Sequence, residues 1–368
     1  MSGFYQNGYR VFVFRDRPFD VAQGRPFDFA QGRRATSIEN DALRVTVLHE
    51  GGHIAEILDK GTGINPLWIP PWPSIEPSIY DAAQHPAYGS GAEAPLLAGI
   101  MGHNLCLDIF GGPSPDEAAA GLPVHGEAST ARFAVDANAN AIAMNALLPA
   151  AQLRVERRIV LVDRVVHVHE SIENLSATDR PIGWTHHVTL GPPFLEKGVT
   201  QFRASATRSR VFEGTFGPDD TLVAGADFDW PLAPRLSGGS EDLRTYTTAP
   251  RSCAYTAHLM DPARGEAFFV AFSRSAALAF GYAWRRADFP WMGIWEENYS
   301  RTAPPWNGLT LTRGLEFGVS PMPATRRQMI GRGLLFDTPT FRWIPGRRRI
   351  DVDYRAVLQR AERIPESL

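Results

Sequence analysis

The stretch LRVERRIVLVDRVVHVHESIEN, residues 153–174, decides the fold class, because apolar and polar residues alternate along most of it. Leu153 and Val155 alternate with Arg154 and Glu156, and the same spacing returns further along the stretch. A period of two is what a β-strand with one buried face produces. The stretch therefore predicts strands that pack one face against a core.

Similar alternation recurs from residue 38 onward, and turn signals interrupt it at short intervals. The turn signals are Gly51-Gly52, Asp219-Asp220, Ser237-Gly238-Gly239 and Pro304-Pro305. Short strands without intervening helices favour antiparallel sheets that pack face to face. We therefore predict one large all-β domain over residues 36–350, with more strands than an immunoglobulin-sized sandwich.

Helical spacing is convincing only near the end of the chain. Tyr354, Val357, Leu358 and Ala361 recur at intervals of three and four residues, which is typical of one face of a helix. This spacing predicts a helix over about 353–364, within a C-terminal helical tail that covers residues 351–368.

Two segments interrupt the strand pattern and predict long loops over a sheet. Residues 64–80, INPLWIPPWPSIEPSIY, contain too many prolines for a central strand. Residues 111–126, GGPSPDEAAAGLPVHG, form a Gly/Pro loop with at most one helical turn. Loops of this length in a compact β protein are more often functional than idle.

The N-terminal segment differs from the rest of the chain. Residues 18–25, PFDVAQGR, and 26–33, PFDFAQGR, form a tandem repeat that differs at one position. Two copies are too few for a solenoid. We expect residues 1–35 to be a poorly ordered leader outside the folded domain, with a short docking arm as the alternative.

Composition narrows the classes of function. The chain has 37 Lys and Arg against 40 Asp and Glu, for a net charge of -3, and its basic residues are scattered except for Arg347, Arg348 and Arg349. This argues against a nucleic-acid or anionic membrane surface. The two cysteines, Cys106 and Cys253, exclude a disulfide framework. We expect a cytoplasmic protein, because no apolar run is long enough for a membrane span or secretory signal. We also expect a monomer or homodimer.

The strand GWTHHVTLG contains two adjacent histidines that alternation assigns to opposite faces. His187 shares a face with Thr185 and Thr189, where a ligand can reach it. His186 shares the other face with Trp184, and we expect it to be a packed or edge histidine.

Two further residues are candidates for proton transfer. Glu316, in LTRGLEFGVSP, has Gly314 and Gly318 as neighbours on its own face, which predicts open space around the carboxylate. The alternative is a solvated strand glutamate. His125, in GLPVHGEAS, ends the long Gly/Pro loop, where an exposed imidazole is common with or without a function.

Three strings, GLPVHGEAS, WTHHVTLGPPFL and GLEFGVSP, together resemble the aldose 1-epimerase (galactose mutarotase) superfamily. The resemblance covers roughly residues 38–345 and implies a β-supersandwich of large antiparallel sheets. It also implies that His187 is the acid at the sugar ring oxygen and Glu316 the base at the anomeric hydroxyl. His125 would bind the sugar or assist proton transfer.

The resemblance is that of a divergent branch. After GIMGH the family has an Asn-Arg pair, whereas this chain has Asn104-Leu105, so the family's sugar-binding arginine is missing there. The strand WTHHVTLG also departs from the family's Asn-His-Pro-Tyr-Phe-Asn string. Besides the acid–base residues, we expect six residues to contact the sugar. They are Asn104, His186, Trp295, Glu296, Glu297 and Trp306.

The function implied is interconversion of the anomers of a hexose or hexose derivative by acid–base ring opening, without cofactor or metal. His167 and His169 share a strand face, yet no further ligands with metal-site spacing accompany them. The alternatives are a non-catalytic carbohydrate-binding protein on the same scaffold, because fold does not fix activity, and a polysaccharide lyase or hydrolase with an extended groove.

Overall fold

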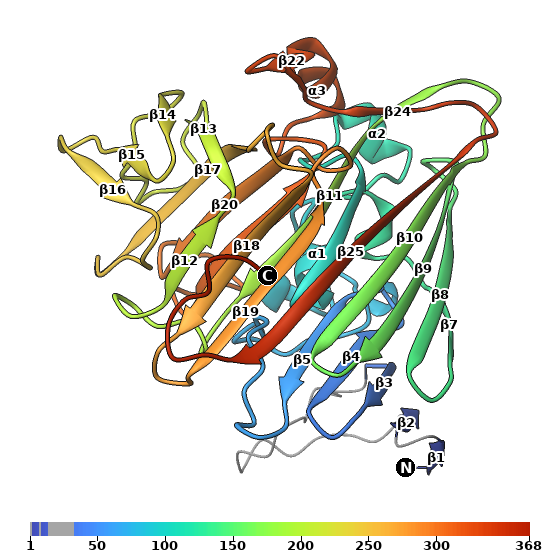
Figure 1. Cartoon of the computed structure of the whole chain (residues 1–368). Coiled ribbons are helices and arrows are strands. Elements are labelled where there is room, and N and C mark those ends of the chain that lie inside the picture. The colour runs from blue at the N-terminus through green and yellow to red at the C-terminus, as the bar shows by residue number, and fades with distance from the viewer. Residues whose placement is uncertain (1, 7–8, 14–32) are drawn as a thin grey trace.

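Two large antiparallel sheets dominate the computed structural model, which describes residues 2–6, 9–13 and 33–368 (Figure 1). The larger sheet has 13 strands in the order β1-β2-β3-β4-β5-β6-β11-β21-β20-β17-β13-β14, with β24 paired to β11. Its strands are β1 (Ser2–Gln6), β2 (Tyr9–Val13), β3 (Ala35–Glu39), β4 (Leu43–Leu48), β5 (Ile54–Asp59), β6 (His103–Asp108), β11 (Arg180–Leu190), β13 (Ala206–Val211), β14 (Asp227–Asp229), β17 (Ser252–Met260), β20 (Trp291–Asn298), β21 (Leu311–Gly318) and β24 (Arg342–Ile344).

The second sheet has eight strands in the order β12-β18-β19-β25-β10-β9-β8-β7. Its strands are β7 (Ala134–Ala137), β8 (Ala141–Leu148), β9 (Leu153–Val162), β10 (Val165–Asn174), β12 (Gln201–Ala204), β18 (Glu266–Ser273), β19 (Leu278–Arg285) and β25 (Arg349–Arg360). The sequence stretch 153–174 thus forms the hairpin β9-β10, as its alternation predicts.

Two strand pairs and several short helices lie outside the two large sheets. The two-stranded pairs are β15 (Leu232–Pro234) with β16 (Ser240–Asp242) and β22 (Leu334–Leu335) with β23 (Thr338–Pro339). The helices of the described residues are short: α1 (Ala94–Gly99), α2 (Pro115–Ala119), α3 (Arg326–Arg332), and the 3₁₀ turns η1 (Pro77–Ile79), η2 (Pro86–Tyr88) and η3 (Glu127–Ser129). Among the described residues, no helix is both long and apolar enough to cross a membrane.

The main core lies between the two sheets. Alternate residues of both sheets point into it, so that Trp284 of β19 stacks on Phe317 of β21 with ring centroids 4.4 Å apart. This core extends along most of both sheets. Burial of apolar surface stabilises the folded state by about 25 cal/mol per Å². The central strands of the larger sheet are therefore anchored along their whole length.

Loops cover the other face of those central strands and form a second, smaller core. It includes Trp68 and Leu97 from the segment before β6, and Tyr255 and Trp295 from the sheet itself. The segments 64–80 and 111–126 are largely irregular and lie over this face, as predicted; the second contains only the five-residue helix α2. The central strands are consequently buried on both faces.

The predicted C-terminal helix over 353–364 is wrong, because residues 349–360 form strand β25. Val352, Tyr354, Ala356 and Leu358 are all buried in the main core, whereas the intervening Asp351 and Asp353 are exposed. The segment therefore carries a period of two beside its helical spacing. Backbone hydrogen bonding to β10 on one side and β19 on the other decides between them (Figure 1).

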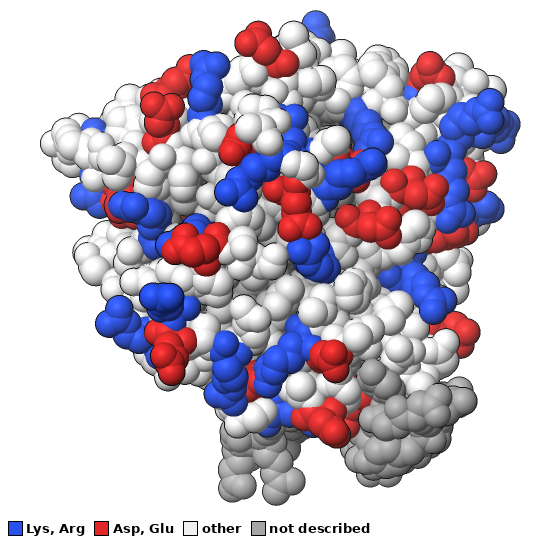
Figure 2. All heavy atoms as spheres, viewed as in Figure 1, with Lys and Arg blue, Asp and Glu red and all other residues white. Residues whose placement is uncertain are grey.

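The repeat at 18–33 lies outside the described residues except for its last residue. Arg33 is buried, and its guanidinium donates to Glu76 and to Ser74. Earlier in the expected leader, the backbones of β1 and β2 pair with each other, and β2 pairs with β3. Acidic and basic side chains are mixed over the face seen in Figure 2, which shows no continuous basic surface there.

Candidate active site

Strand register brings two predicted proton-transfer residues together. His187 of β11 lies opposite Glu316 of β21, and on its other side opposite Asn104 of β6. Glu316 in turn lies opposite Gly293 of β20. Directly opposite residues of an antiparallel pair project to the same face. All of these side chains therefore project to the face that the loops cover, away from the main core.

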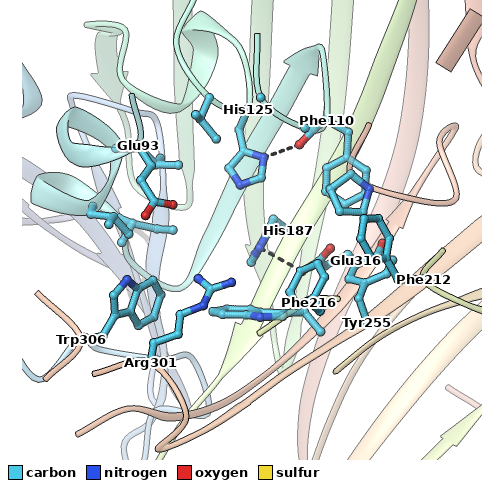
Figure 3. Close-up of a pocket in the computed structure, with 18 of the residues that line it drawn as sticks. Glu93, Phe110, His125, His187, Phe212, Phe216, Tyr255, Arg301, Trp306 and Glu316 are labelled. Carbon is cyan, nitrogen blue, oxygen red and sulfur yellow. Dashed lines mark hydrogen bonds and ion pairs between the residues drawn. The ribbon is translucent and has the colours of Figure 1, made fainter. Parts of the chain in front are cut away.

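His187 and Glu316 form a close pair at the base of a cavity (Figure 3). Nε2 of His187 lies 2.9 Å from Oε1 of Glu316, and Nδ1 of His187 lies 2.8 Å from the hydroxyl of Thr189. His187 is 5% exposed and Glu316 2% exposed. The pair is thus largely shielded from solvent but reachable from the cavity, whose lining includes both residues.

The glycines beside Glu316 make close packing possible rather than leaving empty space. A Cβ on Gly314 would lie 2.5 Å from Oε1 of Glu316, and a Cβ on Gly318 would lie 2.6 Å from the Thr185 hydroxyl. The expectation of open space on both sides was therefore wrong. The Glu316 carboxylate itself occupies the space above Gly314.

A third glycine allows Tyr255 to approach Glu316. A Cβ on Gly293 would clash with the hydroxyl of Tyr255, which donates to the carbonyl of Pro321 over 3.2 Å. Burial, followed by the charge of Glu316, raises the pKa of Tyr255 well above its ordinary value of 10.0. Tyr255 therefore stays protonated as a neutral neighbour of Glu316. Sequence reasoning missed this residue, because nothing in the string SCAYTAHLM distinguishes it from a core tyrosine.

His125 enters the cavity from the loop that precedes η3. Its backbone has a positive φ of 66° and leads into Gly126, where a Cβ would clash with the carbonyl of Leu107. The carbonyl oxygen of Phe110 accepts a hydrogen bond from Nδ1. Burial, followed by the proximity of His187, lowers the pKa of His125 from 6.5 to about 3. The ring is therefore neutral, and Nε2 is left as a hydrogen-bond acceptor.

An ion-pair cluster fixes the loop that carries His125. The buried carboxylate of Asp108 accepts hydrogen bonds from Arg180 at 2.7 and 2.8 Å and from Arg326 at 3.0 Å. Arg326 also donates to Glu117 of α2 over 2.7 Å. Such charge-assisted hydrogen bonds are strong and directional. The cluster joins the end of β6, the loop and α3 beside the cavity.

The cavity has a volume of about 320 Å³, and apolar and aromatic side chains make up much of its wall. Its aromatic lining consists of Phe110, Phe212, Phe216, Tyr255, Trp295 and Trp306. Trp306 is supported from behind by Trp68 and Trp72, with ring centroids 6.2 and 5.0 Å away. Ligand cavities of this size with flat rings and a few polar groups are typical of small-molecule sites.

Arg301 also lines the cavity, and sequence reasoning did not single it out. It follows β20 in a turn held by Glu297, whose Oε1 accepts the backbone N–H groups of Ser300 and Arg301. Figure 3 shows the guanidinium directed into the cavity, beside Trp306 and below His125.

Of the predicted residues, His125, His187, Trp295, Trp306 and Glu316 line the cavity. The other four predicted residues lie elsewhere. Asn104 is fully buried beside His187 without reaching the cavity wall, and Glu297 lies beneath the turn at Arg301.

Glu296 and His186 project from the opposite side of their strands, so the prediction that they contact the ligand disagrees with their position. Glu296 is bonded to Arg313 and Ser252. His186 is enclosed in the main core, where it stacks on Phe317. In both cases alternation along the strand determines the face.

The comparisons with known proteins identify the fold. No family profile and no curated protein matches the sequence. Solved structures do match over almost the whole chain. A candidate aldose 1-epimerase from Klebsiella pneumoniae has a TM-score of 0.63 at 14% identity, covering 96% of this chain and 84% of that one.

Two further structures agree with the first. A candidate aldose 1-epimerase from Escherichia coli K12 has a TM-score of 0.59 at 12% identity, over 89% of this chain and 100% of that one. A galactose mutarotase related enzyme from Lactobacillus acidophilus has a TM-score of 0.57 at 13% identity, over 89% and 99%. The chain has the galactose mutarotase-like fold, which confirms the fold that the resemblance implied.

Proposed function

We propose that the protein is an isomerase of the aldose 1-epimerase type that interconverts the anomers of a hexose or hexose derivative. The observation that carries the proposal is the contact of 2.9 Å between His187 and Glu316 within an aromatic cavity of about 320 Å³. Ring opening requires a base and an acid, which a carboxylate and an imidazole can supply. The cavity has room for one sugar ring.

In the proposed reaction, Glu316 removes the proton from the anomeric hydroxyl while His187 donates a proton to the ring oxygen. The bond between C1 and the ring oxygen breaks and leaves an open-chain aldehyde. Both reacting oxygens are attached to C1, so two groups in direct contact serve both proton transfers. After rotation about the C1–C2 bond, the transfers run in reverse and close the ring on the other face of the carbonyl.

The remaining cavity residues support binding. Neutral His125 offers the lone pair of Nε2 to a sugar hydroxyl, and its low pKa prevents it from competing with His187 as the proton donor. The rings of Trp295 and Trp306 offer flat apolar surfaces to the C–H face of a sugar. His125 is thus assigned to sugar binding rather than to proton donation.

The alternative of a carbohydrate hydrolase receives less support. Such an enzyme uses a pair of carboxylates on either side of the scissile bond. Apart from Glu316, the carboxylate that lines the cavity is Glu93, an exposed residue just before α1. A non-catalytic binding protein on the same scaffold is the alternative that needs an experiment.

The test is anomer equilibration of freshly dissolved α-hexoses, followed by polarimetry or NMR with and without protein. We expect the wild type to accelerate equilibration, and Glu316→Gln to lower kcat about 10²- to 10⁴-fold, since general acid–base catalysis contributes that much. Glu362→Gln, at an exposed position, is the matched control and should keep the wild-type rate. Equal rates with and without wild-type protein across a panel of sugars would leave only the binding function.

A further inference from the structure

From the cavity we infer a substrate class: an aldose that carries a carboxylate, which Arg301 binds. This inference rests on the proposed isomerase function and concerns the same cavity. It makes Arg301 the residue that distinguishes a uronic acid from a neutral hexose.

Arg301 differs from the buried arginines of this protein. Arg33, Arg157 and Arg313 each hydrogen-bond a glutamate of the protein. Arg301 has only a distant partner, because its Nε lies 3.5 Å from Oε2 of Glu297. Among the described residues, no hydrogen bond from the terminal nitrogens Nη1 and Nη2 of Arg301 is found.

Aromatic rings hold the guanidinium of Arg301 in place. Its central carbon lies 4.8 Å from the ring centroid of Trp306, 5.6 Å from that of Trp295 and 5.8 Å from that of Phe216. Cation–π contacts use the faces of the rings and leave the N–H groups available. The side chain is 27% exposed and lines the cavity, so these donors are accessible to a ligand.

A preorganised guanidinium with free terminal N–H groups is suited to a planar anion. The two terminal nitrogens match the two oxygens of a carboxylate in a bidentate hydrogen-bonded pair. Arg301 lines the same cavity as His187 and Glu316, so one bound sugar can offer its carboxylate to Arg301 and its anomeric centre to the pair.

Glu93 provides a second test of the inference, because its negative charge should repel the anion that Arg301 attracts. This glutamate lines the same cavity and is exposed, so its charge is screened by solvent. An anionic sugar would be repelled weakly by Glu93 and attracted by the less exposed Arg301. Removal of each charge should therefore change the preference for an anion in opposite directions.

The experiment compares kcat/KM for matched pairs of sugars: galacturonate with galactose, and glucuronate with glucose. Glucose 6-phosphate forms a third arm. We expect the wild type to favour the uronate. Arg301→Gln should lower the ratio of uronate to neutral sugar roughly 10- to 100-fold, as expected for loss of a charge-assisted bidentate contact. Glu93→Gln should raise this ratio about two- to threefold.

Arg327→Gln, at an exposed position of α3, is the control and should leave the ratio unchanged. Arg301→Lys keeps the charge without the fork and should retain part of the preference, and melting temperatures check the folding of each variant. Equal or better use of neutral sugars, or an equal loss on both sugars in Arg301→Gln, would overturn the inference. A preference for glucose 6-phosphate over both uronates would show that Arg301 binds a phosphate rather than a carboxylate, and would overturn the inferred substrate class.

Failure of the proposed function itself is recognised separately. In that case no sugar equilibrates faster with protein, and calorimetry of galacturonate and galactose binding tests Arg301 directly. Tighter binding of the uronate that is lost in Arg301→Gln would support the inference without catalysis, and equal binding of the two sugars would refute it.

Discussion

The two faces of strand β11 have different surroundings: one packs into the main core and the other borders the cavity. His186 points into the main core, where its Nδ1 lies 3.2 Å from Nε2 of His103 and its ring stacks on Phe317 at 4.6 Å. His187, the next residue, points to the cavity and meets Glu316. One residue of offset therefore separates a core histidine from the histidine that we propose as the proton donor.

The carboxylates on the two faces show why their roles differ. Behind the sheet, both oxygens of Glu170 are engaged by the protein, one by Arg157 over 2.7 Å and one by the indole N–H of Trp184 over 2.8 Å. In front, Oε1 of Glu316 has the close contact with His187 but no aligned hydrogen bond. A buried polar group that the protein leaves incompletely satisfied is a group that a ligand can satisfy.

The largest effects should come from replacing each of the two histidines separately. We expect His187→Asn to lower kcat for anomer equilibration about 10²- to 10⁴-fold, because the proton donor is lost, with little change in unfolding free energy. His186→Asn should do the reverse and lower the unfolding free energy by about 2–4 kcal/mol, because it leaves a gap in a packed aromatic core. The measurements are kcat for anomer equilibration and the unfolding free energy from urea titration, for both variants and the wild type. A variant of His186 that is stable but inactive would contradict the division between the faces.

An intermediate effect is expected at Gly293, which lies opposite Glu316. Gly293→Ala places a methyl group where the Tyr255 hydroxyl lies and should displace Tyr255 from its place beside Glu316. We expect a loss of roughly 10- to 100-fold in kcat, as small misplacements of reacting groups produce, and about 1–3 kcal/mol in unfolding free energy. The matched control is Gly265→Ala, where a Cβ would meet nothing within 4 Å. Unchanged kinetics in Gly293→Ala would show that Tyr255 does not position Glu316.

The smallest effect concerns acid stability and the rear face of β11. Burial, followed by the proximity of His103, lowers the pKa of His186 well below its ordinary value of 6.5. As pH falls below 6.5, His186 binds a proton in the unfolded chain but not in the folded protein. Protonation therefore stabilises the unfolded chain, and the unfolding free energy falls. Urea unfolding at several pH values should show the wild type losing more stability than His186→Asn between pH 6.5 and 5. The difference should approach about 1.4 kcal/mol per pH unit. Parallel curves would mean that folded His186 titrates normally.

Alternation alone predicted the sheets and the opposite orientations of His186 and His187, since both follow from the geometry of a strand. The helical spacing misled at β25, where helical and strand spacing coexist and the edges of β10 and β19 decide the outcome. Pairing partners far away in the chain cannot be deduced from a local pattern.

The site was predicted in part. His125, His187 and Glu316 stand in strings with distinctive glycines or polar neighbours, and the structure brings them together. Tyr255 and Arg301 escaped notice because their roles depend on tertiary contacts, namely the absence of a side chain at Gly293 and the aromatic rings around the guanidinium. Neither contact has a signature in the adjacent sequence.

The position of β25 has a consequence for how the chain matures on the ribosome. This strand, near the end of the sequence, lies between β19 and β10 in the middle of its sheet. Until residues 349–360 emerge, both neighbouring strands expose unpaired backbone edges, and such edges promote aggregation during synthesis. The two halves of the sheet are joined through β25, so the edges of β19 and β10 stay open to other chains until β25 inserts between them.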